Sequence, residues 1–389
     1  MTENKSFFSS WEAESDICGR CGNCRAECPT YRQTGWESAT PRGKMTLLRR
    51  AALSQGGEER ALLAKRISEC TLCGSCTSQC AARIDLQQVW KQVRGELKKQ
   101  GELPPAYDLL VKNLLDKKNI SQFDNAARLD WAEELDEVPE CLEAQEGSEV
   151  AYFVGCVSSF FPRAGQVPVA MVQLLERAGV SYTTLGGEEW CCGFPLLAAG
   201  AAEEMDAFAR HNVEAVRELG VKTLITSCPS CYHTWTHEYP QRLGEELGFR
   251  VLHSTEYLLE LVRQGQLVPE ELEETVTYHD PCDLGRNSGQ YAAPRELLQT
   301  IPGLELVEMA SHGANAACCG GGGNLQSAAP QMAENIAKAR VGEAMATGAT
   351  YLVSACQQCE QMLEKAARVE KAPLQVLDVA EILWLAVDG

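Results

Sequence analysis

The residues that could do the most chemistry in this sequence are its cysteines, which number 19 among 389 residues. A chain of this length can bury a core large enough to fold without disulfide bonds. Its composition is otherwise ordinary, with 45% hydrophobic residues, 23% charged residues and a formal net charge of −19. A surface this acidic repels phosphate, so nucleic acid is not an expected partner. The thiols therefore point to metal binding.

The first eight cysteines form two matching runs. They are Cys18, Cys21, Cys24 and Cys28, followed by Cys70, Cys73, Cys76 and Cys80. This is the spacing of bacterial ferredoxins, in which the fourth cysteine of each run ligates the cluster of the other run. We therefore expect one [4Fe–4S] cube on Cys18, Cys21, Cys24 and Cys80, and another on Cys70, Cys73, Cys76 and Cys28. Zinc is the alternative, but it favours two CxxC pairs at a longer separation.

Ten further cysteines repeat at wider spacing. The first set is Cys156, Cys191, Cys192, Cys228 and Cys231, and the second is Cys282, Cys318, Cys319, Cys356 and Cys359. Equivalent members lie 126 to 128 residues apart, which indicates an internal duplication. Adjacent cysteines can ligate two different irons or bridge them, so five ligands suggest a cluster larger or more open than a cube. Cys141 is left over, and we expect it to be a free thiol.

Short β-rich runs that end on cysteine must position these ligands. They span residues 150–156, 221–228, 276–282 and 351–356, and helical patterns at 167–178, 205–219 and 332–346 lie between them. Alternating strands and helices predict a small α/β unit with a mostly parallel sheet in each half. The cysteines would then lie at the carboxyl ends of the strands, where open α/β sheets bind ligands. Pro229, directly after Cys228, fits the first turn of a helix.

The composition between these regions suggests the domain boundaries. Pro104 and Pro105 end the helix after the second cysteine run, and residues 131–150 hold eight acidic side chains and no Lys or Arg. We expect an α/β protein of four segments. They are a mainly α-helical ferredoxin domain with two cubes at 1–100, an acidic linker at 101–148 packed loosely or against a partner, and two duplicated α/β domains at 149–270 and 271–389.

The sequence also bears on location. Residues 1–16 have no basic start followed by an apolar run, so we expect no signal peptide. No stretch approaches 18 consecutive apolar residues, so we expect no transmembrane segment. The expected location is the cytoplasm, with attachment to a membrane only through a partner as the alternative.

At this point the motifs resemble a known family. The repeated Cys-Cys-Gly pattern is similar to the CCG domain of archaeal heterodisulfide reductase and its bacterial relatives. The order of a two-cube domain and two CCG domains resembles the D-type subunit, which is equivalent to fused C and B subunits. Supporting motifs are Pro-Arg-Gly-Lys at 41–44, Trp-Cys-Cys-Gly-Phe-Pro at 190–195, His-Asp-Pro-Cys at 279–282 and Cys-Cys-Gly at 318–320. Iron–sulfur subunits of glycolate, lactate and glycerol-3-phosphate dehydrogenases share this architecture, but in several of them the CCG cysteines are incomplete.

The resemblance implies that each set of five cysteines binds a noncubane [4Fe–4S] cluster and that the two clusters clamp a disulfide between them. Cys192 and Cys319 are then the candidate catalytic ligands. Electrons would arrive through the cubes from a flavin-containing or other redox subunit of a larger complex, and a small disulfide would be the substrate. Two alternatives stay open. The chain could be an electron relay in a flavin-based, bifurcating complex, or the iron–sulfur subunit of a glycolate- or lactate-type dehydrogenase.

Several other residues have two interpretations. The CxxC pairs ending at Cys231 and Cys359 also have the spacing of thioredoxin-like dithiols, although the duplicated frame favours metal. The glycine run at 320–323 could cradle a phosphate, but close packing of backbone on a cluster fits better. His279 and Asp280 could transfer protons or hydrogen-bond to the site. Three basic residues could neutralise a cluster, bind an acidic substrate or form ordinary salt bridges: Arg42, Lys44 and Arg286.

Overall fold

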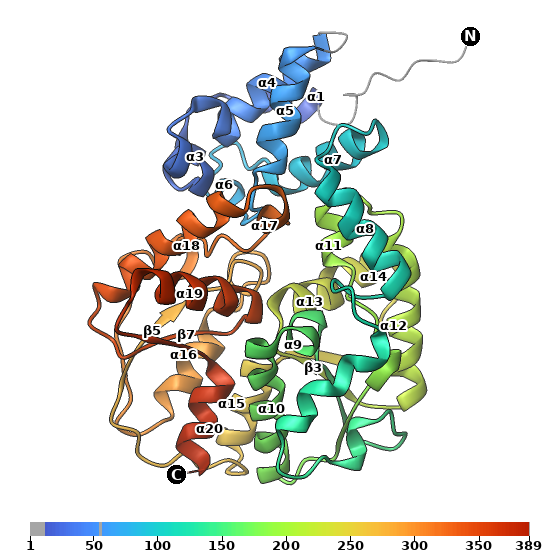
Figure 1. Ribbon diagram of the computed structural model, residues 1–389, viewed down its shortest axis with the longest axis vertical. Helices are drawn as coiled ribbons and strands as arrows, with labels where there is room; N and C mark the ends of the chain where they lie inside the picture. The colour runs from blue at the N-terminus through green and yellow to red at the C-terminus, as the bar shows by residue number, and fades with distance from the viewer. Residues whose placement is uncertain (1–11, 54–56, 389) are drawn as a thin grey trace.

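The computed structural model describes residues 12–53 and 57–388, so most of the segment tested for a signal peptide lies outside the described residues. Figure 1 shows a helical domain at one end of the molecule, above two α/β halves that lie side by side. The arrangement confirms the predicted fold class, an α/β protein with a helical N-terminal domain and a duplicated α/β unit.

The N-terminal domain is built from helices alone within the described residues. They are α1 (Glu12–Ile17), α2 (Asn23–Ala26), α3 (Pro29–Thr34), the 3₁₀ helix η1 (Glu37–Ala39), α4 (Pro41–Leu53), α5 (Glu58–Ser68), α6 (Ser75–Ser78) and α7 (Leu86–Lys99). The one-turn helices α2 and α6 begin at equivalent places in the two cysteine runs and contact each other. Helix α7 is amphipathic, and its apolar side, which includes Val89, Trp90 and Val93, is buried.

Each α/β half contains a four-stranded parallel sheet. The strands are β1 (Val150–Phe153), β2 (Tyr182–Thr184), β3 (Thr223–Thr226) and β4 (Arg250–His253), then β5 (Thr275–His279), β6 (Glu305–Leu306), β7 (Tyr351–Ser354) and β8 (Gln375–Asp378). The strand orders are β2-β1-β3-β4 and β6-β5-β7-β8, so the two sheets have the same topology. Strands β1, β3, β5 and β7 are the predicted cysteine-ending runs. The other four are two to four residues long and do not lead into a cysteine, so spacing did not reveal them.

Helices cover these sheets. In the first half they are α9 (Cys156–Phe160), α10 (Gln166–Arg177), α11 (Phe194–Ala198), α12 (Met205–Leu219), α13 (Pro229–His233), α14 (Tyr239–Leu243) and α15 (Ser254–Arg263). In the second half they are α16 (Ala292–Gln299), α17 (Leu325–Ala328), α18 (Pro330–Met345), α19 (Gln357–Glu370) and α20 (Val379–Asp388). In the part of the chain that the structure describes, no helix combines the length and apolar character needed to cross a membrane.

The segment at 101–148 does not pack loosely, which corrects our expectation for it. Helix α8 (Pro105–Lys117) lies against α11 and α17, and the 3₁₀ helix η2 (Asn125–Glu134) lies against α9. Tyr107, Leu114 and Trp131 are buried, whereas the acidic side chains that suggested a linker face solvent. A few apolar anchors are therefore enough to hold an acidic segment on the core.

Arg94 on α7 joins all three regions. Its side chain is fully buried and donates hydrogen bonds to four carbonyl oxygens. Nη2 reaches Ile67 at 2.9 Å and Cys70 at 2.5 Å in the helical domain, and Nη1 reaches Ala198 at 2.6 Å and Gly323 at 2.7 Å in the two halves. Since a guanidinium offers five N–H donors in one plane, a single residue can satisfy carbonyls from three directions.

Replacing Arg94 with Met should therefore loosen the junction. The substitution leaves four buried carbonyls without this donor, so we expect the free energy of unfolding to fall by at least about 3 kcal/mol. Urea denaturation followed by circular dichroism measures the change. Arg49→Met is the matched control, because the Arg49 side chain is 45% exposed and its ion pair with Asp16 is a surface contact. A loss for Arg94→Met no larger than that of the control would contradict this role.

Candidate functional site

The first cavity in the helical domain is lined by one cysteine from the second run and three from the first. Cys18, Cys21, Cys24 and Cys80 surround a space of about 390 Å³. Arg42 lies beside it and donates from Nη1 to the backbone oxygen of Arg20 at 3.4 Å, which steadies the cysteine loop. Cys21 is exposed, so this cavity lies closest to solvent of the four cysteine groups.

The second cavity contains the complementary group. Cys28, Cys70, Cys73 and Cys76 surround about 360 Å³, together with Lys44 and Trp90. Lys44 is almost completely buried. Burial acts to lower its pKa, but the thiolates of Cys70, Cys28 and Cys76 outweigh it and leave the pKa of Lys44 raised. The lysine therefore stays charged beside four sulfurs, as needed to offset the negative charge of a thiolate-bound cluster.

The first set of five cysteines converges at the ends of β1 and β3. Hydrogen-bonding contacts run without a break from Cys156 through Cys191, Cys192 and Cys231 to Cys228. As predicted, Pro229 opens helix α13 directly after Cys228. Hydrogen bonds from Cys191 and Cys231 hold the pKa of Cys192 well below its usual range, which favours the thiolate that a metal requires.

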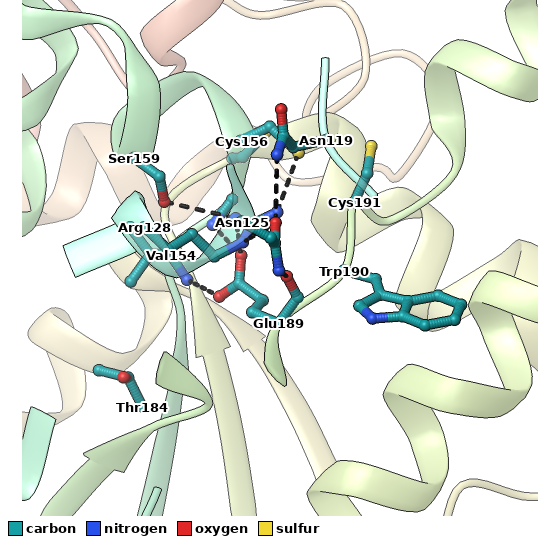
Figure 2. Close-up of polar contacts among 12 residues, drawn as sticks. Asn119, Asn125, Arg128, Val154, Cys156, Ser159, Thr184, Glu189, Trp190 and Cys191 are labelled. Carbon is teal, nitrogen blue, oxygen red and sulfur yellow. Dashed lines mark hydrogen bonds and ion pairs between the residues drawn. The ribbon is translucent and has the colours of Figure 1, made fainter. Parts of the chain in front are cut away.

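A buried ion pair supports this first site, as Figure 2 shows. Arg128 on η2 donates to Glu189 at 2.6 Å and, through Nη2, to the Cys156 sulfur at 3.4 Å. Glu189 in turn accepts from the backbone nitrogens of Val154 at 2.8 Å and Gly155 at 2.9 Å. Burial raises the pKa of Glu189, and the Arg128 guanidinium opposes that shift. The pair fixes the loop that carries Cys156.

The second set of five cysteines converges in the same way at the ends of β5 and β7. Contacts run from Cys318 to Cys319, Cys359 and Cys356, and Cys282 lies close enough to interact electrostatically with Cys318. Hydrogen bonds from Cys318 and Cys359 hold the pKa of Cys319 well below its usual range. Cys192 and Cys319, the equivalent second members of the Cys-Cys pairs, thus both have a pKa below the usual range.

His279 and Asp280 face different groups. A ring nitrogen of His279 lies within 4.8 Å of the sulfurs of Cys319 and Cys359, and Arg340 donates from Nε to its Nδ1 at 3.0 Å. Both oxygens of Asp280 accept from Arg295, at 2.7 and 2.9 Å. Although burial acts to raise it, those hydrogen bonds hold the pKa of Asp280 below its usual value. Asp280 is therefore an ionised partner of Arg295, and its Oδ2 also accepts from the backbone nitrogen of Gly313 at 2.7 Å.

The second cavity of the helical domain touches the second five-cysteine site. Cys73 and Cys318 lie within hydrogen-bonding distance of each other. Arg286 donates from Nε to the Cys73 carbonyl at 2.9 Å and from Nη1 to the Ala316 carbonyl at 2.8 Å, so it spans the contact. At Gly323, whose φ is +59°, a Cβ atom would lie 2.6 Å from the Cys70 carbonyl oxygen. Gly322 and Gly323 thus pack on the backbone of the helical domain, whereas Gly320 and Gly321 face residues of the second half. Packing of the glycine run on a cluster stays a prediction.

The two five-cysteine sites also adjoin each other. Ser230, within the Cys228–Cys231 turn, donates to Asp283 at 2.5 Å, directly after Cys282. Gln357, directly after Cys356, donates from Nε2 to the Ser227 carbonyl at 3.0 Å. Cysteine loops of the two halves are therefore joined by direct hydrogen bonds. Cys141 lies apart from all four groups, half-buried, with Tyr182 as its hydrogen-bonding neighbour.

The donor sets fit iron–sulfur clusters. Two cavities each collect four thiols, and two further sites each collect five thiols around a thiol of lowered pKa. Thiolate is the ligand that iron–sulfur clusters require. A buried nitrogen that has no hydrogen-bond partner among the described residues, Nη2 of Arg340, also lies in the second half, near Cys319. Such an atom is what an additional acceptor, absent from the polypeptide, would leave behind.

Sequence reasoning missed Arg128, Glu189 and Arg340. One signal was present for the first of them, because Arg128 is the only Lys or Arg between Lys118 and Arg163. A lone cation in an acidic stretch is a candidate for a buried ion pair. Arg340 lies among ordinary helix residues of α18, and nothing in its neighbourhood of the sequence sets it apart.

Comparison with known proteins gives a consistent result. Residues 150–235 and 276–364 match the model of a cysteine-rich domain named CCG, and residues 14–84 match that of a 4Fe-4S dicluster domain. The chain is 34% identical over 388 residues to the D-type subunit of the dihydromethanophenazine:CoB–CoM heterodisulfide reductase of Methanosarcina mazei, covering 95% of this chain and 93% of that protein.

Two further matches differ in extent. The chain is 30% identical over 425 residues to EtfAB:quinone oxidoreductase of Syntrophomonas wolfei, covering 96% of this chain and 58% of that protein. A crystal structure of a hypothetical protein from Helicobacter pylori is similar with a TM-score of 0.62 and 12% identity, covering 99% of this chain and 76% of that one. At this identity the likeness concerns the fold alone.

Replacing Arg128 with Ala should destabilise the first site. The change leaves Glu189 buried without its ion partner, so we expect a loss of about 3–5 kcal/mol in the free energy of unfolding. Adding Glu189→Gln should recover part of this loss, because the unpaired charge is then removed. Urea denaturation at pH 7 measures both, with Arg177→Ala on the exposed side of α10 as a control expected to change stability by less than about 0.5 kcal/mol. A double variant no more stable than Arg128→Ala would refute the ion-pair explanation.

Proposed function

We propose a function from the family to which this chain belongs, that of the D-type heterodisulfide reductase subunits, which makes it an iron–sulfur oxidoreductase subunit. In this proposal, the chain carries electrons from a redox partner through two cubane [4Fe–4S] clusters to two noncubane [4Fe–4S] clusters. A disulfide is reduced at the noncubane clusters. The observation that carries the proposal is the meeting of two complete five-cysteine sites through direct hydrogen bonds.

We assign the ligands by the groupings described above. One cube would be held by Cys18, Cys21, Cys24 and Cys80, and the other by Cys28, Cys70, Cys73 and Cys76. The noncubane clusters would be held by Cys156, Cys191, Cys192, Cys228 and Cys231, and by Cys282, Cys318, Cys319, Cys356 and Cys359. When bound, each noncubane cluster would supply one electron to the S–S bond and take one of its sulfurs.

The packing of the chain supports one order of electron transfer. The exposure of Cys21 supports the outer cavity as the point where a partner would deliver electrons. The inner cavity adjoins the second five-cysteine site through Cys73 and Cys318, and that site adjoins the first through Ser230 and Asp283. Since the outer and inner cavities share Pro41 in their lining, the four groups lie in one series, from the surface of the helical domain to the junction of the two halves.

The reaction at the end of this series balances as one disulfide, two electrons and two protons giving two thiols. Most of the ten cysteines are buried, so the polypeptide keeps bulk water away from their sulfurs. Arg286 and Arg340 lie near these sulfurs and offset negative charge as electrons arrive. The residues that recognise the substrate would lie in the loops between the two halves.

The electron donor would be a flavin-containing or other redox protein that docks on the helical domain. The names of the matched Methanosarcina proteins support this, since each is named as one component of a reductase with several different chains. We retain the division into a ferredoxin domain at 1–100, a connecting segment at 101–148 and CCG domains at 149–270 and 271–389 as part of the proposal.

A relay role is the second candidate, favoured by one observation. The chain matches EtfAB:quinone oxidoreductase along 96% of its own length, although that protein is longer. In a relay, the five-cysteine sites would pass electrons to another acceptor and break no S–S bond. The dehydrogenase-subunit alternative is less favoured, because all ten cysteines are present and converge in two complete sites.

Cysteine variants separate these roles. We expect Cys192→Ala and Cys319→Ala each to lower the rate of disulfide-dependent oxidation of the dithionite-reduced protein by more than about 100-fold. This loss exceeds the one expected when a residue that only hydrogen-bonds to a metal ligand is changed. Cys141→Ala is the matched control and should retain the wild-type rate, because Cys141 touches none of the four cysteine groups. Stopped-flow absorbance with a series of low-molecular-weight disulfides measures the rates. Wild-type protein with full iron content that reduces none of them would instead favour the relay.

A further inference from the structure

The two halves place different residues beside their equivalent cysteines. Cys156 corresponds to Cys282 at an offset of 126, which aligns Phe153 at the end of β1 with His279 at the end of β5. Cys228 corresponds to Cys356 at an offset of 128, which aligns Asn212 on α12 with Arg340 on α18. An apolar and a neutral residue in the first half thus correspond to a histidine and an arginine in the second.

Arg340 fixes the tautomer of His279, so that Nε2 of the ring carries the proton. Arg340 donates from Nε to Nδ1 at 3.0 Å, and an arginine N–H can only donate. Nδ1 is therefore the acceptor, and in a neutral imidazole the proton lies on Nε2. No residue in the described part of the chain accepts a hydrogen bond from Nε2, and the ring lies within 4.8 Å of the Cys319 and Cys359 sulfurs.

This arrangement favours a hydrogen-bond donor over an iron ligand. A neutral histidine that ligated iron through Nε2 would have to carry its proton on Nδ1, where Arg340 already donates. Arg340 is itself buried, and no residue in the described part of the chain accepts a hydrogen bond from its Nη2. This N–H group is therefore free for another acceptor near Cys319.

The first half lacks this pair. Phe153 has no donor and packs edge-on against Trp235 at 5.4 Å. Asn212 turns to the backbone, donating from Nδ2 to the Cys191 carbonyl at 3.2 Å. Arg128 does donate to Cys156, but its charge is cancelled by Glu189, since both side chains are only 2% exposed. Glu343, the partner of Arg340, is 27% exposed, so water screens its charge far more.

We propose that His279, held by Arg340, donates an N–H···S hydrogen bond into the second five-cysteine site and raises its reduction potential above that of the first, so that the second site takes up the first electron. Reduction adds one negative charge to a cluster, and a donor or a buried cation stabilises that charge. The inference rests on the proposed function only in requiring a cluster at each five-cysteine site.

The position of the second site suits this role. It contacts the inner cavity of the helical domain through Cys73 and Cys318, so it is next in line for an electron from that cavity. A higher potential makes that transfer favourable. The first site, reached last, then acts as the stronger reductant of the two.

A redox titration of the cluster-loaded full chain, followed by EPR, tests the proposal. Cys319→Ala identifies the signal of the second site by its loss. We expect His279→Phe, which installs the residue of the first half, to lower the potential of that signal alone. His279→Gln keeps an N–H donor near the place of Nε2 and should restore part of the shift. His312→Phe, at an exposed histidine whose Nδ1 contacts the Met309 carbonyl, is the control and should change neither potential.

Three outcomes would overturn the proposal: no shift in His279→Phe, equal shifts at both five-cysteine sites, or loss of iron, which would make His279 a ligand. Should His279→Phe fail to fold, Arg340→Asn decides, because it installs the other first-half residue and should also lower the second potential alone. The titration needs no disulfide, so a protein with unequal potentials but no disulfide turnover would refute the proposed function and leave this inference standing.

Discussion

The fold depends on one buried cation that holds three regions together. Arg94 donates to carbonyls of the helical domain, the first half and the second half, and its side chain is fully buried. One of those carbonyls belongs to Cys70, and another to Gly323, which is four residues past Cys319. The same hydrogen bonds that close the junction therefore fix the distance between a cysteine group of the helical domain and the second five-cysteine site. The contacts that pack the domains together therefore also set the spacing of the redox sites.

The internal duplication explains why both halves have the same sheet and five cysteines, and the residues that differ between the halves distinguish their two sites. Both sheets have the same strand order and bring five sulfurs to the same edge. Among the described residues, the second half alone contacts the helical domain through a cysteine, and it alone places a histidine and an unpartnered arginine nitrogen near its sulfurs. Two sites with the same reduction potential would share electrons evenly, whereas sites with different potentials favour electron transfer in one direction.

The grouping of the cysteines and the internal duplication could be predicted from the sequence. Ferredoxin spacing grouped the first eight cysteines, and the offset of the Cys-Cys pairs revealed the duplication, because both patterns are local or repeated. Contacts such as Arg128 with Cys156 could not be predicted in this way, since they join segments whose docking depends on the whole core. The acidic run at 131–150 misled us about packing, because its charges face solvent while Trp131 and Leu142 are buried.

The proposed function requires that the two five-cysteine sites together break a disulfide. The decisive experiment is EPR of the oxidised, cluster-loaded chain with a thiol added and removed. If the sites bind substrate sulfur, a paramagnetic signal appears with the thiol, disappears on its removal and is absent from Cys192→Ala and Cys319→Ala. A fully loaded protein whose spectrum is the same with and without thiols and disulfides would contradict the account and leave electron relay as the function.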